Sequence, residues 1–218
     1  VQQVGPEVDL RGLKLQGTNL RGVNLIRTNL EGVNLTGADL RGAKLAGANL
    51  IEASLNNSDL SEANFFNANL TGADLSEAVL LGAVLQGAVA SNANFSGALM
   101  GSIEAGVAFM EILPEAEFPV RILKVDLSGA NLTGADLHGA KLNEANLKGA
   151  DLTGADLYMA KLIQTDLAGT NLTEANLKWA NLHEANLEGA DLSGAKANKF
   201  TTWPEGFDPK AGGEIFDD

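Results

Sequence analysis

Cysteine is absent from the 218-residue chain, which excludes disulfides, thiolate metal sites and cysteine nucleophiles. Aromatic residues make up only 5% of the chain although 45% of it is apolar, so a core must be built from leucine and alanine rather than from rings. Basic residues are few, 15 against 28 acidic ones, and the formal net charge is −13. This excess of acid disfavours direct binding to nucleic acid or anionic lipid, because both need clustered lysine and arginine.

Long hydrophobic runs are also missing. No stretch approaches the roughly eighteen uninterrupted apolar residues of a membrane span, and the N-terminal VQQVGPEVDL lacks the basic-then-apolar pattern of an export signal. We therefore expect no membrane association and a cytoplasmic location. The thylakoid lumen or the periplasm is the alternative if a leader was removed before Val1.

A five-residue repeat runs through most of the chain. It holds one frame from Leu10 to Met100, as in ADLRG AKLAG ANL, then resumes two residues out of phase at Leu127 and continues to Ala197. Of its 34 copies, 29 carry leucine at the centre, 24 carry alanine two residues earlier, 24 carry Asp or Asn just before the centre, and 19 carry glycine two residues after it. The consensus is A(D/N)LxG.

This period predicts a closed coil, because neither the 3.6-residue helical repeat nor the two-residue strand repeat keeps every fifth residue on one side. If the central leucine and the preceding alanine point inward and the glycine position turns a corner, four pentapeptides close a square of twenty residues. Glycine tolerates the corner backbone, and Asp or Asn can accept a hydrogen bond from it. Squares stacked about 4.8 Å apart would form a parallel β-structure around a column of leucines.

The consensus resembles the pentapeptide repeat protein family over about residues 8–199. The resemblance implies an all-β fold, a right-handed quadrilateral parallel β-helix of about eight to nine coils. The leucine- and alanine-rich composition is similar to that of cyanobacterial and plastid members, many of which have no assigned activity.

Two segments depart from the repeat and divide the chain. The boundary at 101–124 is blurred because Ala108, Met110, Val120 and Ile122 still fit the two repeat frames. We expect a surface loop at one corner, with a junction of two once separate blocks or a short helix through 103–112 as alternatives. The predicted units are an N-terminal plug (1–7), a first repeat block (8–110), a loop insertion or junction (111–119), a second repeat block (120–199) and a C-terminal capping tail (200–218).

The tail abandons the repeat and introduces three aromatic residues, Trp203, Phe207 and Phe216. Open solenoid ends expose core side chains and unpaired strand edges, so we predict that these residues form a cap.

An apolar exterior is predicted just before the break, because Val79, Leu81, Val84 and Val89 occupy outward positions that are usually polar. We expect Phe109, Ile112 or Phe118 from the insertion to cover this patch. A partner protein is the alternative occupant.

A second candidate surface emerges when side chains twenty residues apart are stacked. His138, Tyr158 and Lys178 fall on one outward ladder, with Met159 and Trp179 beside them at the corner. Aromatic side chains of this kind favour protein recognition. The alternative is that the tail or a neighbouring molecule covers them.

Catalytic motifs are missing. The two histidines, His138 and His183, fall on different faces of the predicted coil, no GxSxG, GxxxxGK[ST] or GxGxxG motif is present, and the carboxylates face outward. We expect no catalytic residues, no cofactor and no metal, and therefore no enzyme.

The sequence thus favours a non-catalytic scaffold, a protein-interaction rod with an unknown partner, present as a monomer or weak dimer. The resemblance adds an alternative, since some acidic family members mimic DNA and occupy the DNA site of gyrase. The charge is uneven for that role: residues 1–100 carry −3, residues 101–125 carry −2 and residues 126–218 carry −8. Duplex DNA of the expected rod length, about 41 Å, carries about 24 charges.

Overall fold

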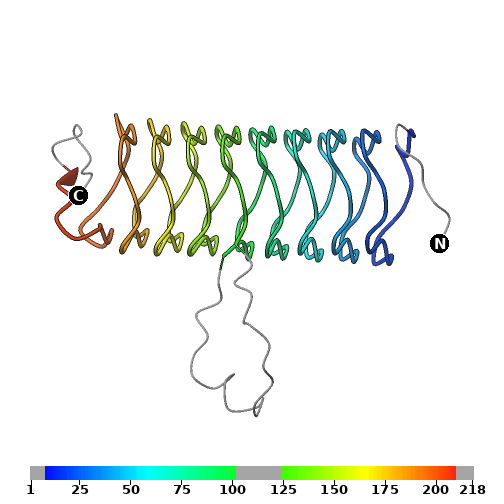
Figure 1. The fold of residues 1–218 in the computed structure, drawn as a ribbon, viewed down its shortest axis with the longest axis horizontal. Helices are drawn as coiled ribbons and strands as arrows, with labels where there is room; N and C mark the ends of the chain where they lie inside the picture. The colour runs from blue at the N-terminus through cyan, green and yellow to red at the C-terminus, as the bar shows by residue number, and fades with distance from the viewer. Residues whose placement is uncertain (1–7, 102–123, 210–218) are drawn as a thin grey trace, which may run out of the picture.

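The protein is a rod of stacked coils that runs from the N-terminal end to the C-terminal end without reversing direction (Figure 1). The structure is a computed structural model that describes residues 8–101 and 124–209. Within these two ranges the chain alternates single-residue parallel bridges with two-residue turns, and it forms no continuous strand.

Pairing joins residues 20 apart, and this defines four ladders along the rod. The residue before each central position bridges its counterpart one coil later, as Asp9 does with Asn29 and Asn29 with Asn49. The first, second, third and fourth ladders begin at Asp9, Lys14, Asn19 and Asn24, and each has eight or nine rungs within the described residues. Four pentapeptides therefore complete one coil.

Hydrogen bonds hold neighbouring coils together on every face. Around Leu30, for example, the leucine N–H donates to the Asn49 carbonyl oxygen (2.7 Å), and the Asn49 N–H donates back to Thr28 (3.0 Å). At the following corner, the N–H of Gly32 donates to Ile51 (2.9 Å), and that of Val33 donates to Leu30 within the turn (3.1 Å). Nearly every backbone group of a repeat is thereby satisfied without a long strand.

The interior is a packed column of leucine and alanine. Central leucines from Leu30 to Leu182 are buried, as are most of the alanines two positions before them. Burying each leucine stabilises the fold by about 1.5–3 kcal/mol. Alanine occupies the second inward position because the leucines leave little volume there.

The corners adopt the left-handed backbone that the glycine preference predicts. Glycines at this position have positive φ, as in Gly32 (63°), a region that glycine enters without steric cost. In most repeats an Asp or Asn side chain before the corner accepts from the backbone two residues on; Asn34 Oδ1, for example, accepts from the Thr36 N–H at 3.0 Å. These bonds confirm the predicted role of Asp and Asn before the leucine.

Pairing passes across the insertion without a break. Val84 bridges Asp126, 42 residues later instead of 20, and the difference of 22 equals the length of segment 102–123. The Val125 N–H donates to the Met100 carbonyl (3.2 Å), which is the turn bond found at other corners, and Lys124 forms an ion pair with Glu144 (3.0 Å). One side of the coil therefore ends at Gly101, and the next side begins at Lys124. The repeat positions assigned to Ala108, Met110, Val120 and Ile122, and the 111–119 loop, lie outside the described residues.

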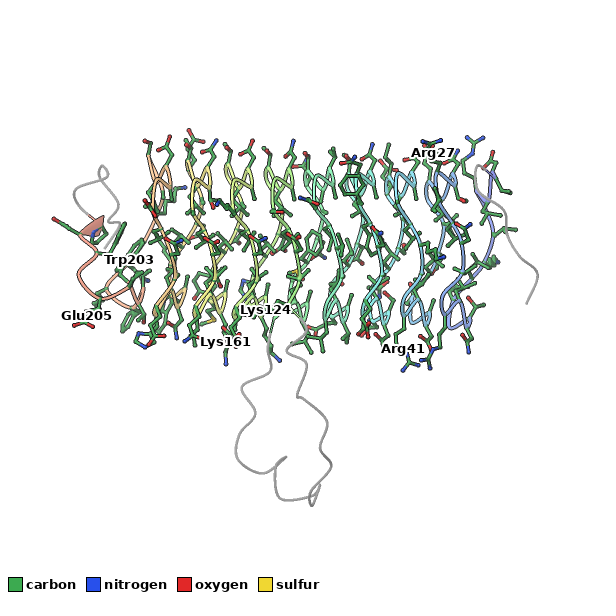
Figure 2. The ribbon with its side chains drawn as sticks, in the orientation of Figure 1. Arg27, Arg41, Lys124, Lys161, Trp203 and Glu205 are labelled. Atoms are coloured by element: carbon green, nitrogen blue, oxygen red, sulfur yellow. The ribbon has the colours of Figure 1, made fainter. Side chains whose placement is uncertain are left out.

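Residues 200–209 of the tail lie at the C-terminal end of the rod. Trp203 and Phe207 stack on each other, with ring centroids 5.3 Å apart, and pack against the hydrophobic core. Figure 2 places Trp203 at this end and Arg27 and Arg41 toward the other. Phe216 and the predicted plug at 1–7 lie outside the described residues.

Candidate interaction surfaces

Leucine and alanine side chains fill the interior of the described part of the rod. A surface depression of about 200 Å³ is lined by Arg21, Arg41, Gly42, Ser61 and Glu62. Among the described residues, no three His, Cys, Asp or Glu side chains gather as metal ligands would.

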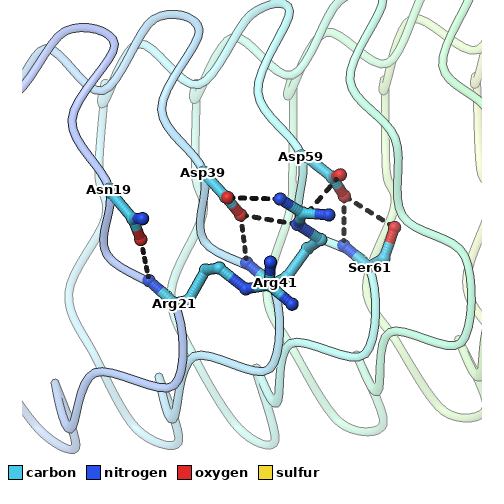
Figure 3. Close-up of polar contacts among 6 residues, drawn as sticks. All are labelled: Asn19, Arg21, Asp39, Arg41, Asp59 and Ser61. Carbon is cyan, nitrogen blue, oxygen red and sulfur yellow. Dashed lines mark hydrogen bonds and ion pairs between the residues drawn. The ribbon is translucent and has the colours of Figure 1, made fainter.

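Figure 3 shows polar contacts along the third ladder, where Arg21, Arg41 and Ser61 also line this depression. Arg41 binds both carboxylate oxygens of Asp39 and approaches Asp59 from its Nε (3.4 Å). Hydrogen bonds from Arg41 lower the pKa of Asp39 to about 2. The positive charge of Arg41 is therefore largely balanced by the two carboxylates, and the network links neighbouring coils on the surface.

The predicted aromatic ladder forms on the second ladder of the rod. The His138 and Tyr158 rings stack with centroids 5.1 Å apart and an interplanar angle of 22°. Lys178 follows one rung later, and Met159 and Trp179 occupy the adjoining corner. Met159 is 46% exposed and Trp179 is 41% exposed.

The tail adds an aromatic residue that the repeat pattern does not predict. Phe200 stacks on Trp179 with centroids only 3.9 Å apart and planes within 14°, yet Phe200 is still 49% exposed. Asn198 Oδ1 accepts from the N–H of both Trp179 (3.2 Å) and Phe200 (3.1 Å). The Thr201 hydroxyl accepts a hydrogen bond from the Asn198 N–H and donates one to the Leu177 carbonyl oxygen. These bonds fix Phe200 over Trp179.

Sequence reasoning missed Phe200 because the register changes by one residue in the tail. Asn181 bridges Thr202, 21 residues later, whereas the pairs on the same face that do not span segment 102–123 are 20 apart. Projection of the repeat frame beyond Ala197 therefore misplaces the residues that follow. Asn198 is the sequence feature that could have indicated this change. It directly follows Ala197, the centre of the last repeat.

The corner backbone distinguishes Met159 and Trp179 from all other corner residues. Thirteen non-glycine residues in the described ranges have positive φ, and eleven of them are Asn, Gln, Glu or Arg. The other two are Met159 (φ 58°) and Trp179 (φ 63°), on consecutive coils of one corner. A bulky apolar side chain is unfavourable in this backbone region.

Lysines surround the Trp179–Phe200 stack. Lys178 precedes Trp179, while Lys196 and Lys199 lie on the next rung; Lys199 Nζ is 5.2 Å from the Phe200 ring centroid, within range of a cation–π interaction. The two segments that carry these side chains, 176–179 and 196–200, contain no acidic residue. Both segments are therefore basic, on a protein of net charge −13.

The apolar exterior predicted before the insertion is partly exposed. Val89 is 39% exposed, while Val79, Leu81 and Val84 are half-buried. These residues belong to three different ladders, so they do not form one flat face. Phe109, Ile112 and Phe118, which were expected to cover them, lie outside the described residues.

On the first ladder, a row of threonines is bonded to the carboxylate and amide side chains beside it. Thr153 donates to Asp151 (2.6 Å) and Thr173 donates to Asn171 (2.6 Å). Hydrogen bonds from Thr153 lower the pKa of Asp151 below its ordinary value. These contacts use up the hydroxyl donors, which favours a structural role for this face.

Comparison with known proteins agrees with this architecture. The family model described as pentapeptide repeats matches eight copies, over residues 7–42, 43–80, 63–100, 124–158 and 160–196. The chain therefore belongs to the pentapeptide repeat family. Its solved members imply a right-handed quadrilateral β-helix, and the family is one of generally non-catalytic repeat proteins.

Solved structures similar to this chain come from several sources. HetL of the cyanobacterium Nostoc sp. strain PCC 7120, described as involved in heterocyst differentiation regulation, is 30% identical over 87% of each chain, with a TM-score of 0.34. A pentapeptide repeat protein of the Arabidopsis thaliana thylakoid lumen is 32% identical over 49% of this chain and 71% of its own, with a TM-score of 0.41.

Trypsin-treated QnrB1, a plasmid-mediated fluoroquinolone resistance protein, is 20% identical over 89% of this chain and 92% of its own, with a TM-score of 0.52. This likeness concerns the fold alone. No curated protein matches the sequence significantly. The described residues include no helix long and apolar enough to cross a membrane.

Proposed function

We propose that the protein is an interaction rod that presents an aromatic surface to a partner protein, with no chemistry of its own. The surface comprises His138, Tyr158, Met159, Lys178 and Trp179. The observation that carries the proposal is the exposure of Met159 and Trp179 at a corner whose backbone disfavours them. Strained positions persist where function compensates for their cost.

Affinity capture from the source cells tests this role. The wild-type protein should retain a partner that the double variant Tyr158→Ala/Trp179→Ala loses. Phe66→Ala is the matched control, because Phe66 is an exposed aromatic (43%) on a different ladder. Thermal unfolding of each variant must show that the rod is intact. Retention of every partner by the folded double variant would contradict the proposed surface.

DNA mimicry directed at gyrase is the second candidate, supported by the net charge of −13. The distribution of charge weakens it, because residues 8–50 carry six basic and three acidic side chains and are therefore positive. A supercoiling assay with purified gyrase distinguishes the candidates. Inhibition, or protection from a quinolone, at micromolar protein would favour mimicry over the interaction rod.

A further inference from the structure

We infer that the Trp179–Phe200 stack and the lysines around it, Lys178, Lys196 and Lys199, bind an acidic segment of a partner protein that carries an exposed apolar side chain. This inference rests on the proposed function and specifies the partner's chemistry. It also moves the centre of the site toward the C-terminal end, where the tail supplies Phe200, one of the two stacked rings. We call these five residues the tail platform.

The tail platform has the geometry of a preformed apolar contact. Trp179 and Phe200 lie nearly parallel, 3.9 Å apart, and each leaves more than two-fifths of its surface exposed. The Asn198 side chain holds both backbones in place, so little conformational freedom remains to be lost on binding. Rigid aromatic anchors of this kind contribute most of the affinity in protein interfaces.

The backbone at Trp179 is the second observation. Its corner takes glycine or a polar residue in nearly all other coils, and tryptophan at φ 63° adds a steric cost without filling the core. Met159, at φ 58°, repeats the exception one coil earlier and extends the apolar surface toward the His138–Tyr158 stack. The apolar edge therefore spans several rungs, which suits an elongated segment.

Charge complementarity identifies the occupant as acidic. Lys196 and Lys199 are exposed, and segments 176–179 and 196–200 contain no carboxylate. Acidic side chains flanking an apolar anchor would meet lysines on the same two rungs as the stack. Single-stranded nucleic acid also binds aromatic and basic groups, but it carries a charge on every nucleotide, so the net charge of −13 repels it more strongly than a short acidic segment.

Direct binding of synthetic peptides tests the inference. The probe is a fluorescein-labelled peptide in which glutamates flank a central leucine, and fluorescence anisotropy measures its Kd with the full-length protein. Replacing the glutamates by glutamine, or the leucine by serine, should each weaken binding about tenfold. Added salt should weaken binding of the acidic peptide because it screens exposed charges.

Variants of the protein assign the contact to the tail platform. Lys196→Glu/Lys199→Glu should weaken the acidic peptide about tenfold or more, since both lysines are exposed and the fold should not change. Phe200→Ala should also weaken it. Lys14→Glu and Phe66→Ala are the matched controls on exposed residues away from the platform, and they should leave the Kd unchanged. If Phe200→Ala lowers the unfolding temperature, its loss of affinity could come from unfolding, and the lysine variant alone tests the contact.

The inference would be overturned by equal binding of the glutamine peptide, by a loss of affinity in the control variants equal to that in the platform variants, or by tighter binding of an oligothymidylate than of the acidic peptide. Absence of any peptide binding would overturn it as well. If cellular capture still depends on Tyr158 and Trp179 in that case, the proposed function stands and only the acidic chemistry is wrong.

Discussion

Gly101 lies directly against the backbone of Asn143, one coil further along the rod. A Cβ on Gly101 would come within 2.1 Å of the Asn143 carbonyl oxygen and 2.5 Å of its nitrogen. Asn143 is itself buried, and its Oδ1 accepts from the Ile163 N–H (3.2 Å). The last described residue before the insertion is thus packed tightly against the coil that follows.

Gly101→Ala should therefore destabilise the rod by about 3 kcal/mol, because the clash is with main-chain atoms that cannot rotate away. Gly139→Ala is the control: nothing lies within 4 Å of its Cβ position, and only its φ of +63° opposes alanine, at a cost of about 1 kcal/mol. Urea unfolding of both variants measures the difference. Equal destabilisation would show that the contact with Asn143 relaxes easily.

Deletion of residues 102–123 should leave a folded rod. Val125 already makes the turn bond to Met100, so Gly101 and Lys124 would become neighbours in an ordinary corner. Closing a loop of this length costs about 2–3 kcal/mol of entropy, so the deleted form should be at least as stable as the wild type in urea unfolding. Deleting 102–124 is the control, since one further residue exchanges inward and outward positions and should destabilise the rod.

Thr28→Val should stabilise the protein by about 1 kcal/mol. Thr28 is fully buried, and its hydroxyl has no hydrogen-bond partner among the described residues; a buried unpaired hydroxyl is unfavourable. Thr170→Val is the matched control at the same repeat position, and there the hydroxyl donates to Leu167 (2.6 Å). The midpoint temperature of thermal unfolding should rise for Thr28→Val and fall for Thr170→Val. A downward shift for both would refute the assignment.

The Arg41–Asp39 pair should contribute stability that acid removes. The pKa of Asp39 is lowered from 3.8 to about 2 by hydrogen bonds from Arg41, so its contribution is present above pH 3.8 and is lost as the pH falls through 2. Carboxyl NMR titration of Arg41→Gln should show the pKa of Asp39 returning toward 3.8. Asp191 is the control, because Ser193 rather than Arg41 lowers its pKa. An unchanged Asp39 titration would contradict the pairing.

The repeat carried most of the fold information because its inward and outward positions are set by spacing alone. Leucine every fifth residue predicted the buried column, and the hydrogen bonds between residues such as Leu30 and Asn49 follow the 20-residue coil derived from it. The handedness came from resemblance, because spacing does not distinguish the two hands.

The candidate site was only partly predictable. His138 and Tyr158 stack because they are 20 residues apart in a regular region, so the coil length alone predicted their contact. The position of Phe200 was not predicted, because hydrogen bonds of Asn198 and Thr201 replace the repeat geometry there and the five-residue period does not extend to them. The extra residue before Thr202 then moves the tail out of the predicted register.

The register across the insertion also bears on how such rods diversify. A segment of 22 residues leaves at Gly101 and returns at Lys124 while the flanking rungs stay aligned, although 22 is not a multiple of five. The number of amino acids inserted at a corner is therefore independent of the repeat unit. Evolution can lengthen, shorten or exchange such an appendage freely, and a designer can graft a foreign peptide at the same junction without re-indexing the scaffold.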